Sequence, residues 1–188
     1  MTTEKTIFNN GKAVDLLAML DAREQRASLE YALLSNLENK YQGCLLVMTM
    51  AIPGPIKTNA KLDLAFENLL SEVKQILNTE HIVQEIKREK NTGLEYYALN
   101  YLAPYELKPL MVKIEEEHPL GRLFDLDIVF LNENNTVEGT SRTELGLPVR
   151  HCFICDRSAK ECGRSRRHSV KELQTEISKR ILRYLNNN

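Results

Sequence analysis

The sequence predicts an α+β fold, with a ferredoxin-like βαββαβ core, an N-terminal helical segment and a Cys- and Arg-rich C-terminal appendage that ends in a helix. The order of strand-like and helix-like apolar patterns along the chain predicts the core. The 188 residues are 43% hydrophobic and 27% charged, with only 8 Gly and 6 Pro, which is typical of a globular protein and unlike a disordered chain. We expect a single domain over 1–188, in which 1–40 form the helical segment, 41–141 the α/β core and 142–188 the appendage.

The N-terminal part predicts a helical segment and one strand. One helix, or two helices in line, is expected over 14–37, because leucines recur there at intervals of three to four residues. A polar stretch between two groups of leucines places Arg23 and Arg26 about one turn apart. A buried strand is expected over 44–52, an apolar run bounded by glycine and proline. The Pro-Gly-Pro sequence that follows predicts a rigid turn, and Lys57 lies just beyond it.

The middle of the chain continues the core pattern with a helix and a hairpin. One apolar helix face is expected over 62–77, with Asn59 as its N-cap. Two strands are expected over 81–89 and 94–102. They are joined at Asn91-Thr92-Gly93, which is a hairpin signal.

A second helix and strand complete the predicted core. The helix has an apolar face over 107–114, and Pro109 either starts or kinks it. The clearest strand of the chain covers 123–131. The turn at 132–135 is expected to lead into a short return strand around Val137.

The C-terminal part of the chain is basic, whereas the rest is acidic. From Arg142 onward there are 11 Lys and Arg against 5 Asp and Glu, and before it there are 14 against 21. This asymmetry predicts an anionic ligand at that end of the protein; a solvated basic surface is the alternative. Ser169 and Glu172 form a capping-box pattern that opens a last helix through Leu185.

Asp125 and Asp127 are the strongest candidates for catalysis. In a strand, alternate residues share a face, so both carboxylates point the same way, about 6.6 Å apart along the chain. Two carboxylates on one face of an apolar strand repel each other unless a cation lies between them. Mg²⁺ suits such a pair, because it takes few protein oxygens and lets substrate phosphates complete its shell. Two acidic residues on a solvent-facing edge strand are the alternative.

Cys152, Cys155, Cys162 and His168 form a second constellation, with two, six and five residues between successive members. Disulfides are disfavoured in a cytosolic chain, so clustered cysteines need another explanation. Three thiolates and one imidazole match the ligands of a tetrahedral structural zinc site, and the first spacing is that of a zinc knuckle. The alternative is that reduced cysteines pack as small hydrophobic residues, as expected for Cys44 in its buried strand.

Arginines surround these cysteines. Guanidinium groups match phosphate oxygens bidentately, so several converging arginines form a polyphosphate site. Arg150 and Arg164 lie among the cysteines, and Arg142 is just upstream. Arg122 directly precedes the strand with the two Asp residues. If these carboxylates hold a metal ion with a phosphate bound to it, the Arg122 side chain is expected to reach that phosphate.

Several function classes find no support in the sequence. No apolar run reaches the roughly 18–20 residues that span a bilayer. Residues 1–5 lack the basic-then-apolar order of a signal peptide. No Walker loop, Rossmann fingerprint or Gly-x-Ser-x-Gly elbow is present. We therefore expect a cytoplasmic protein that does not bind a membrane.

Taken together, the motifs resemble the CitX-type family, the apo-citrate lyase phosphoribosyl-dephospho-CoA transferases. Each motif is short, but their combination is specific and extends from Arg23 to the final helix. The resemblance rests on the stretches 22–26, 51–57, 121–128 and 150–155, and on Ser141, Arg142, Ala159, Cys162, Arg164 and His168. At one position the chain departs from the family pattern: Glu30 stands where relatives tend to carry Gln, so the resemblance assigns this position no ligand role.

The resemblance implies a nucleotidyl transfer. The 2′-(5″-phosphoribosyl)-3′-dephospho-CoA group would pass from its triphosphate precursor to a serine of the apo acyl-carrier subunit of citrate lyase, with release of pyrophosphate. Mg²⁺ on Asp125 and Asp127 would polarise the α-phosphate and orient the serine oxygen. The carrier is expected to dock near the basic C-terminal part. The residues assigned to substrate binding are Arg122, Lys57, Arg23, Arg142, Arg150 and Arg164.

Two other functions remain open at this point. One is a zinc-stabilised, Arg-rich module that binds nucleic acid, which the Cys/His spacing and the basic tail favour. The sequence pI of about 6.4 and the lack of interleaved aromatic residues in the tail argue against it, so no nucleic-acid partner is expected. The other is the same chemistry on a different carrier protein, such as the carrier subunit of malonate decarboxylase.

Overall fold

The structure is a computed structural model that describes residues 6–38, 43–77 and 81–187. The N-terminal five residues, used above to argue against a signal peptide, lie outside the described residues. So do residues 39–42, where the predicted helical segment meets the predicted core. The elements are α1 (Leu16–Ser35), β1 (Cys44–Met50), α2 (Ala60–Leu77), β2 (Ile82–Lys90), β3 (Gly93–Asn100), α3 (Pro104–Glu117), the 3₁₀ helix η2 (Gly121–Leu123), β4 (Phe124–Leu131), β5 (Val137–Gly139), α4 (Ala159–Ser165) and α5 (Val170–Asn187).

The α+β class and the predicted order of elements are confirmed. One five-stranded sheet has the order β2-β3-β1-β4-β5, and every neighbouring pair is antiparallel. Strand β1 lies at its centre, with β3 on one side and β4 on the other. The predicted return strand, β5, pairs with only the last residues of β4, at Val129, Phe130 and Leu131. The first half of β4 therefore has β1 as its only strand neighbour among the described residues.

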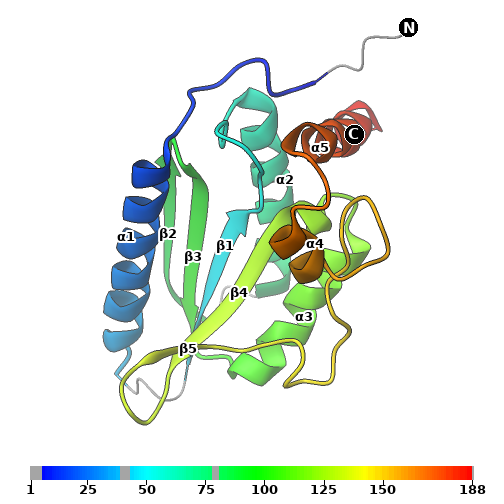
Figure 1. Ribbon diagram of the computed structural model, residues 1–188. Coiled ribbons are helices and arrows are strands. Elements are labelled where there is room, and N and C mark those ends of the chain that lie inside the picture. Colours follow the sequence, from blue (N-terminus) through cyan, green and yellow to red (C-terminus); the bar gives the residue numbers. More distant parts are fainter. Residues whose placement is uncertain (1–5, 39–42, 78–80, 188) are drawn as a thin grey trace, which may run out of the picture.

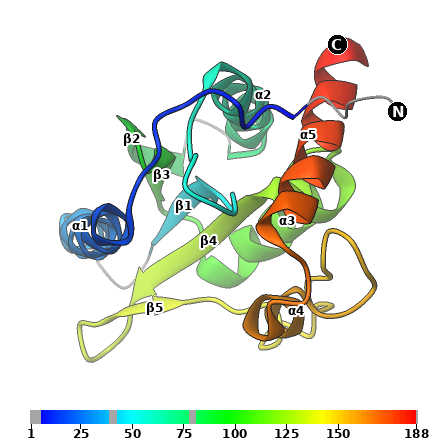
Figure 2. The ribbon, with the colours of Figure 1, turned by 45° about the horizontal axis from the view of Figure 1, so that its top comes forward.

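Helices cover both faces of the sheet (Figures 1 and 2). Helix α1 lies on one face, and α2, α3 and α5 lie on the other. The larger apolar core lies between the sheet and the second group of helices, and α5 contributes Ile177 and Ile181 to it. A smaller cluster lies under α1 and includes Leu33, Leu34 and Tyr97. The final helix is thus part of the main core.

Capping explains several helix boundaries. Asn59 accepts hydrogen bonds from the backbone N–H groups of Lys61 and Leu62, as its predicted role requires. Ser169 and Glu172 form the predicted capping box, each side chain accepting from the other residue's N–H. A residue of this kind at an N-cap stabilises its helix by about 1 kcal/mol.

The structure differs from expectation in three helices. The first leucines of α1, Leu16, Leu17 and Leu20, are exposed, because they lie roughly opposite buried Ala22 around the helix. Helix α3 begins at Pro104, where proline is tolerated, so Pro109 lies inside the helix and does not start it. Helix α4 was not predicted, since seven residues with one buried side chain carry no apolar period.

Gly121 sets how closely β4 approaches α3. A Cβ atom at this position would lie 2.1 Å from the backbone oxygen of Ile114, so no side chain fits. We expect Gly121→Ala to lower the free energy of unfolding by about 3 kcal/mol, because backbone must move to relieve the overlap. Gly163→Ala is the matched control: its Cβ would meet no atom within 4 Å, and alanine in α4 should stabilise by up to about 1 kcal/mol. Urea unfolding of both variants checks this, and equal stabilities would contradict it.

Candidate active site

The two aspartates lie on the face of the sheet that α1 covers. Alternate residues of β4, Phe124, Leu126 and Ile128, enter the main core on the opposite face. Asp125 and Asp127 therefore share a face, as predicted, and 40% and 67% of their side-chain surfaces are exposed. On β1, Thr49 stands opposite Asp125 and Val47 opposite Asp127. A hydroxyl thus flanks the first carboxylate.

Arg150 supplies a cation to Asp125. Its Nη1 forms an ion pair with Asp125 Oδ1, and its Nη2 donates to the carbonyl oxygens of Arg122 and Phe124. The C-terminal segment is thereby attached to the start of β4. Because the protein itself places this charge beside the carboxylate, the repulsion between the two Asp residues does not by itself require a metal ion.

Asp127 has a weaker cationic neighbour. Lys108 Nζ lies 3.9 Å from Asp127 Oδ1. The pKa of Asp127 is raised, first because surrounding protein reduces its hydration and then because of Asp125 and Glu115; Lys108 and Arg150 oppose the rise. With two thirds of the side chain exposed, the carboxylate keeps much of its hydration.

Helix α1 brings further charges to the same face. Arg26 pairs with buried Glu95 of β3 at 3.2 Å. Burial raises the pKa of Glu30, Arg26 lowers it, and the negative charges of Asp127 and Glu95 raise it further. Glu30 is thus within electrostatic reach of Asp127. Arg23 is exposed and lies two turns before Glu30, on the same side of the helix.

Two buried side chains of α3 hold the free edge of β4 at Leu126, between the two aspartates. Lys108 Nζ donates to the Leu126 carbonyl and Glu115 Oε1 accepts from its N–H, both at 2.9 Å. These bonds replace the strand partner that β5 does not provide here. We call these two bonds to Leu126 the clip between α3 and β4. Arg142 pairs with Glu115, one of the two residues of the clip, and also with Glu116, at 2.6 Å.

The remaining predicted arginines take different places. Arg122 Nη2 donates to the carbonyl of Cys152, and its buried Nε has no hydrogen-bond partner among the described residues. Burial lowers the pKa of Arg122, and so do the guanidinium groups near it. Those groups belong to Arg150, Arg180 and Arg142. Arg164 lies on α4 beside a separate surface hollow with Ser158 and Lys160, away from this cluster.

A cavity of about 690 Å³ adjoins the Asp125–Arg150 pair. It lies between the end of β1, the segment around Arg150, and the start of α5. Its cations are Lys57, Arg150 and Arg166, and its apolar walls include Ile52 and Phe153. Burial lowers the pKa of Lys57, whose Nζ donates to the Ile52 carbonyl at 2.6 Å. Lys57 and Arg150, both predicted from the sequence to bind phosphate, thus line one cavity.

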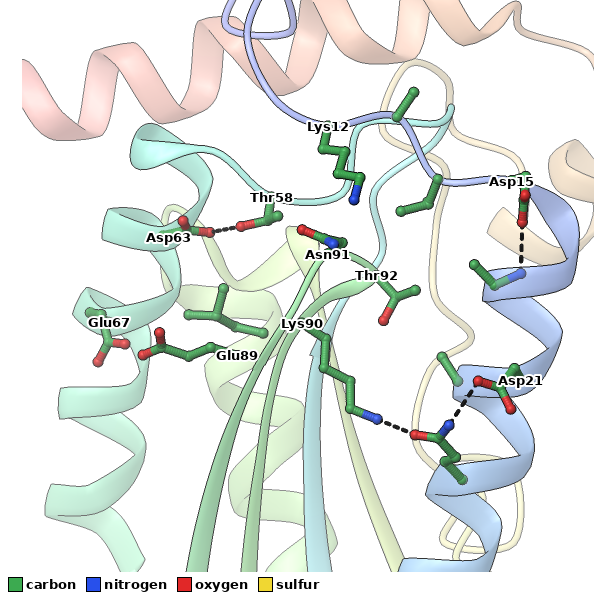
Figure 3. A pocket seen from close by; sticks show the side chains of 16 residues that line it. Lys12, Asp15, Asp21, Thr58, Asp63, Glu67, Glu89, Lys90, Asn91 and Thr92 are labelled. Carbon is green, nitrogen blue, oxygen red and sulfur yellow. Dashed lines mark hydrogen bonds between the residues drawn. The ribbon is translucent and has the colours of Figure 1, made fainter.

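A second cavity, of about 820 Å³, lies between α1, the N-terminal end of α2 and the β2–β3 turn (Figure 3). Several of its polar side chains hydrogen-bond to one another or to nearby backbone. Its charged lining residues are Lys12, Lys90, Asp15, Asp21, Asp63, Glu67 and Glu89. Because acidic residues outnumber basic ones, this cavity suits a triphosphate poorly.

The Cys/His constellation also converges. The ligand atoms of Cys152, Cys155, Cys162 and His168 all lie within 4.8 Å of one another. All the cysteines of the chain are free thiols, and Cys44 is buried in β1, as expected. Sequence spacing alone could not establish this convergence, since α4 and the bridge between His151 and Ser158 bring the ligands together.

Comparison with known proteins now decides the family. The chain matches the family described as CitX, apo-citrate lyase phosphoribosyl-dephospho-CoA transferase, over residues 14–184. The chain belongs to the CitX family. A Streptococcus pyogenes protein named probable apo-citrate lyase phosphoribosyl-dephospho-CoA transferase is 42% identical over 182 residues, which are 97% of this chain and 93% of that protein. A Vibrio cholerae protein of the same name is 35% identical over 138 residues, 71% of this chain and 74% of the relative.

A Haemophilus influenzae protein, Protein CitXG, shows the same similarity within a longer chain. It is 36% identical over 174 residues, which are 92% of this chain but 36% of that protein. In the CitX-family chain described here, no helix among the described residues is long and apolar enough to cross a bilayer.

Sequence reasoning missed three residues of this CitX-family site. Lys108 and Glu115 are seven residues apart on α3, a spacing that puts both on one side of a helix among apolar residues. Charged residues among apolar ones on a helix face indicate that their side chains are buried against polar partners. This pattern could have predicted that Lys108 and Glu115 form buried hydrogen bonds or ion pairs. Thr49 is a polar residue within an otherwise apolar strand, and this polarity is the signal that the sequence offers. Its place opposite Asp125 depends on strand register, which the sequence does not reveal.

Proposed function

We propose that this CitX-family transferase moves the phosphoribosyl-dephospho-CoA group from a triphosphate precursor to a serine of the citrate lyase acyl-carrier subunit. The serine oxygen forms a bond to the α-phosphorus, the bond to the β-phosphate oxygen breaks, and pyrophosphate leaves while the serine proton is lost. The observation that carries the proposal is the Asp125–Arg150 pair, which joins the two-Asp strand to a basic cavity.

The cavity has the chemistry for the donor's phosphates. Lys57, Arg150 and Arg166 line it from different parts of the chain, and their charges would offset those of the triphosphate and of the leaving pyrophosphate. Its apolar walls would exclude water from these ion pairs, which strengthens them. Arg122, with an unpartnered Nε beside Arg150, is positioned to stabilise an oxygen at the same end.

Mg²⁺ on Asp125 and Asp127 is part of the proposal, and the donor set fits it. The ion pairs with Arg150 and Lys108 engage Oδ1 of the two carboxylates, which leaves one oxygen on each for a hard cation. When bound, the ion would supply Lewis-acid polarisation of the α-phosphate. Arg150 would hold Asp125 in place and extend toward the phosphates. Either carboxylate, or a hydroxide on the metal ion, would serve as the base for the serine proton.

The acceptor is proposed to approach from the basic C-terminal side, because carrier proteins of this type are acidic in our expectation and the rest of the chain carries net negative charge. We also propose a cytoplasmic location; free thiols at all four cysteines are typical of a reducing compartment. Family membership does not favour the nucleic-acid-binding alternative. A different carrier as acceptor is the remaining alternative, and the experiment below separates it.

A ferredoxin-like core is proposed for the part from β1 to β4. Strand order β2-β3-β1-β4 with antiparallel neighbours, and helices α2 and α3 on one face, support it. In this arrangement β1 and β4 are adjacent, which places Thr49 beside Asp125.

The test is a change in the intact mass of the acceptor. The protein is incubated with Mg²⁺, the triphosphoribosyl-dephospho-CoA precursor and the apo carrier subunit of citrate lyase, and the carrier is weighed. We expect a gain equal to the phosphoribosyl-dephospho-CoA group. Omission of the precursor and a Ser→Ala carrier are the controls. If a malonate decarboxylase carrier were modified in preference to the citrate lyase carrier, the acceptor would be a different protein from the one proposed. If neither carrier gained mass, the proposed reaction would be contradicted.

A further inference from the structure

The strongest unassigned feature is the group formed by Cys152, Cys155, Cys162 and His168. Cys155 Sγ lies 3.5 Å from Cys162 Sγ and 3.4 Å from His168 Nε2, and Cys162 Sγ lies 4.0 Å from the same nitrogen. A disulfide would bring two sulfurs to about 2.05 Å, so the Cys155–Cys162 contact is not one. Cys152, Cys162 and His168 also line the basic cavity, but no step of the proposed transfer uses their side chains.

These separations match a tetrahedral zinc site. With Zn–S near 2.3 Å and Zn–N near 2.0–2.1 Å, tetrahedral ligands lie about 3.8 Å apart for two sulfurs and about 3.6 Å for sulfur and nitrogen. The three contacts given above fall on both sides of these values, and all ligand atoms fit within 4.8 Å. Four protein ligands fill the tetrahedral shell, which is typical of a structural site and leaves no position for substrate.

The turn that follows Cys152 has the form of a zinc knuckle. The backbone N–H groups of Ile154 and Cys155 hydrogen-bond to the sulfur of Cys152. Zn²⁺ with three thiolates carries one net negative charge, and a basic environment offsets it. Between Cys155 and His168 five cations outnumber two acidic residues, Asp156 and Glu161; the cations are Arg157, Lys160, Arg164, Arg166 and Arg167.

The segment that carries the ligands has few contacts besides these to order it. Arg150 pairs with Asp125, Arg122 donates to the Cys152 carbonyl, and Phe153 packs against the main core. Between β5 and α4 the described chain has no helix or strand beyond the isolated bridge of His151 with Ser158. Val149 and Ile154 are exposed, and Cys162 is the buried residue of α4. Ordering such a segment costs about 1–2 kcal/mol per residue, so a cross-link within it has a large cost to offset. A metal cross-link offsets it directly.

We propose that Cys152, Cys155, Cys162 and His168 form a closed structural zinc site that holds the segment from Arg150 to His168 in place. On binding, each thiol that is protonated releases its proton to solvent, and three S–Zn bonds and one N–Zn bond form. The site lies two residues from Arg150 and carries the Cys152 carbonyl that accepts from Arg122. The zinc site thus positions both arginines, although the inference stands without the proposed transfer.

The first test measures metal in the protein as purified from zinc-supplemented medium. We expect about one zinc per chain by elemental analysis, and an intact mass under denaturing conditions that corresponds to four free thiols. Replacement by Co²⁺ should produce the thiolate-to-cobalt charge-transfer bands and strong visible bands of a tetrahedral sulfur site. Zinc removal by a chelator should lower the melting temperature. A stable metal-free protein, or a mass two hydrogens lower that indicates a disulfide, would overturn the proposal.

Variants identify the ligands. Cys155→Ser and His168→Asn should each lower the zinc content well below one per chain and weaken the cobalt bands. Cys44→Ser is the matched control, since Cys44 lies outside the group and serine keeps a donor for Asn100 and Leu102. Its zinc content should equal that of the unchanged protein. Full zinc content in Cys155→Ser and His168→Asn would place the metal elsewhere. These readouts do not depend on transfer activity, so they are independent of the mass-shift experiment.

Discussion

Asp127→Asn is expected to lower the rate of prosthetic-group transfer by roughly 100-fold or more while leaving the fold intact. The substitution removes a negative charge, and a proposed metal ligand, from a side chain that is two thirds exposed and contributes little to the core. Asp125→Asn should lower the rate similarly. It also loses the ion pair with Arg150, at a cost in stability of up to about 1 kcal/mol. Initial rates from the carrier mass shift measure the first effect, and urea unfolding measures the second.

Glu138→Gln is the control for both variants. Glu138 is an exposed carboxylate on β5, the strand next to β4, and the substitution makes the same change from acid to amide. Transfer by this variant should match that of the unchanged protein. If Asp125→Asn or Asp127→Asn retained near-normal rates at saturating Mg²⁺, the proposed role of the two carboxylates would be wrong, whatever the fate of the reaction itself.

Glu115→Ala is expected to lower the free energy of unfolding by about 3 kcal/mol. The carboxylate is buried, accepts from the N–H of Leu126 and pairs with Arg142. Its removal leaves a buried N–H without a partner and a guanidinium without its nearest charge, both of which cost free energy. The change in the midpoint of urea unfolding, at constant slope, gives the loss.

Glu117→Ala serves as the matched control for Glu115→Ala. It makes the same substitution two residues away on α3, at an exposed side chain whose partner Lys113 is 3.9 Å away. Exposed pairs of this kind contribute a few tenths of a kcal/mol, so the midpoint should hardly move. Similar losses for the two variants would show that helix propensity, not the clip on β4, explains the effect.

Much of the fold was predictable because each core element has a local signal. Helix α2 has an apolar face with Asn59 at its start, and β4 is an apolar run interrupted only by its two acids. The hairpin of β2 and β3 has a glycine with positive φ, Gly93, at its turn. Helix α4 had no such signal. The exposed leucines of α1 gave a misleading one, because the period of apolar residues predicts a helix but does not show whether another element packs against them.

The candidate site was predictable in its carboxylates and not in their partners. Alternation along one strand is enough to put Asp125 and Asp127 on a common face. That Arg150 would meet Asp125, and that Arg142 would instead serve Glu115, depends on the path of the chain between β5 and α5. Several arginines lie near the motif in the sequence, and residue type alone does not show which of them contacts a carboxylate. Only their positions in the folded protein distinguish them.

The sequence by itself determined the class of fold, the order of the core elements, the two-Asp strand and the family resemblance, since all of these depend on residue types at short, regular spacing. Tertiary structure decided the rest: the convergence of three cysteines and a histidine, the clip that Lys108 and Glu115 place on Leu126, and the cavity that Lys57 and Arg150 share. The physical reason is that these contacts join residues distant in the chain, and packing, not local preference, brings such residues together.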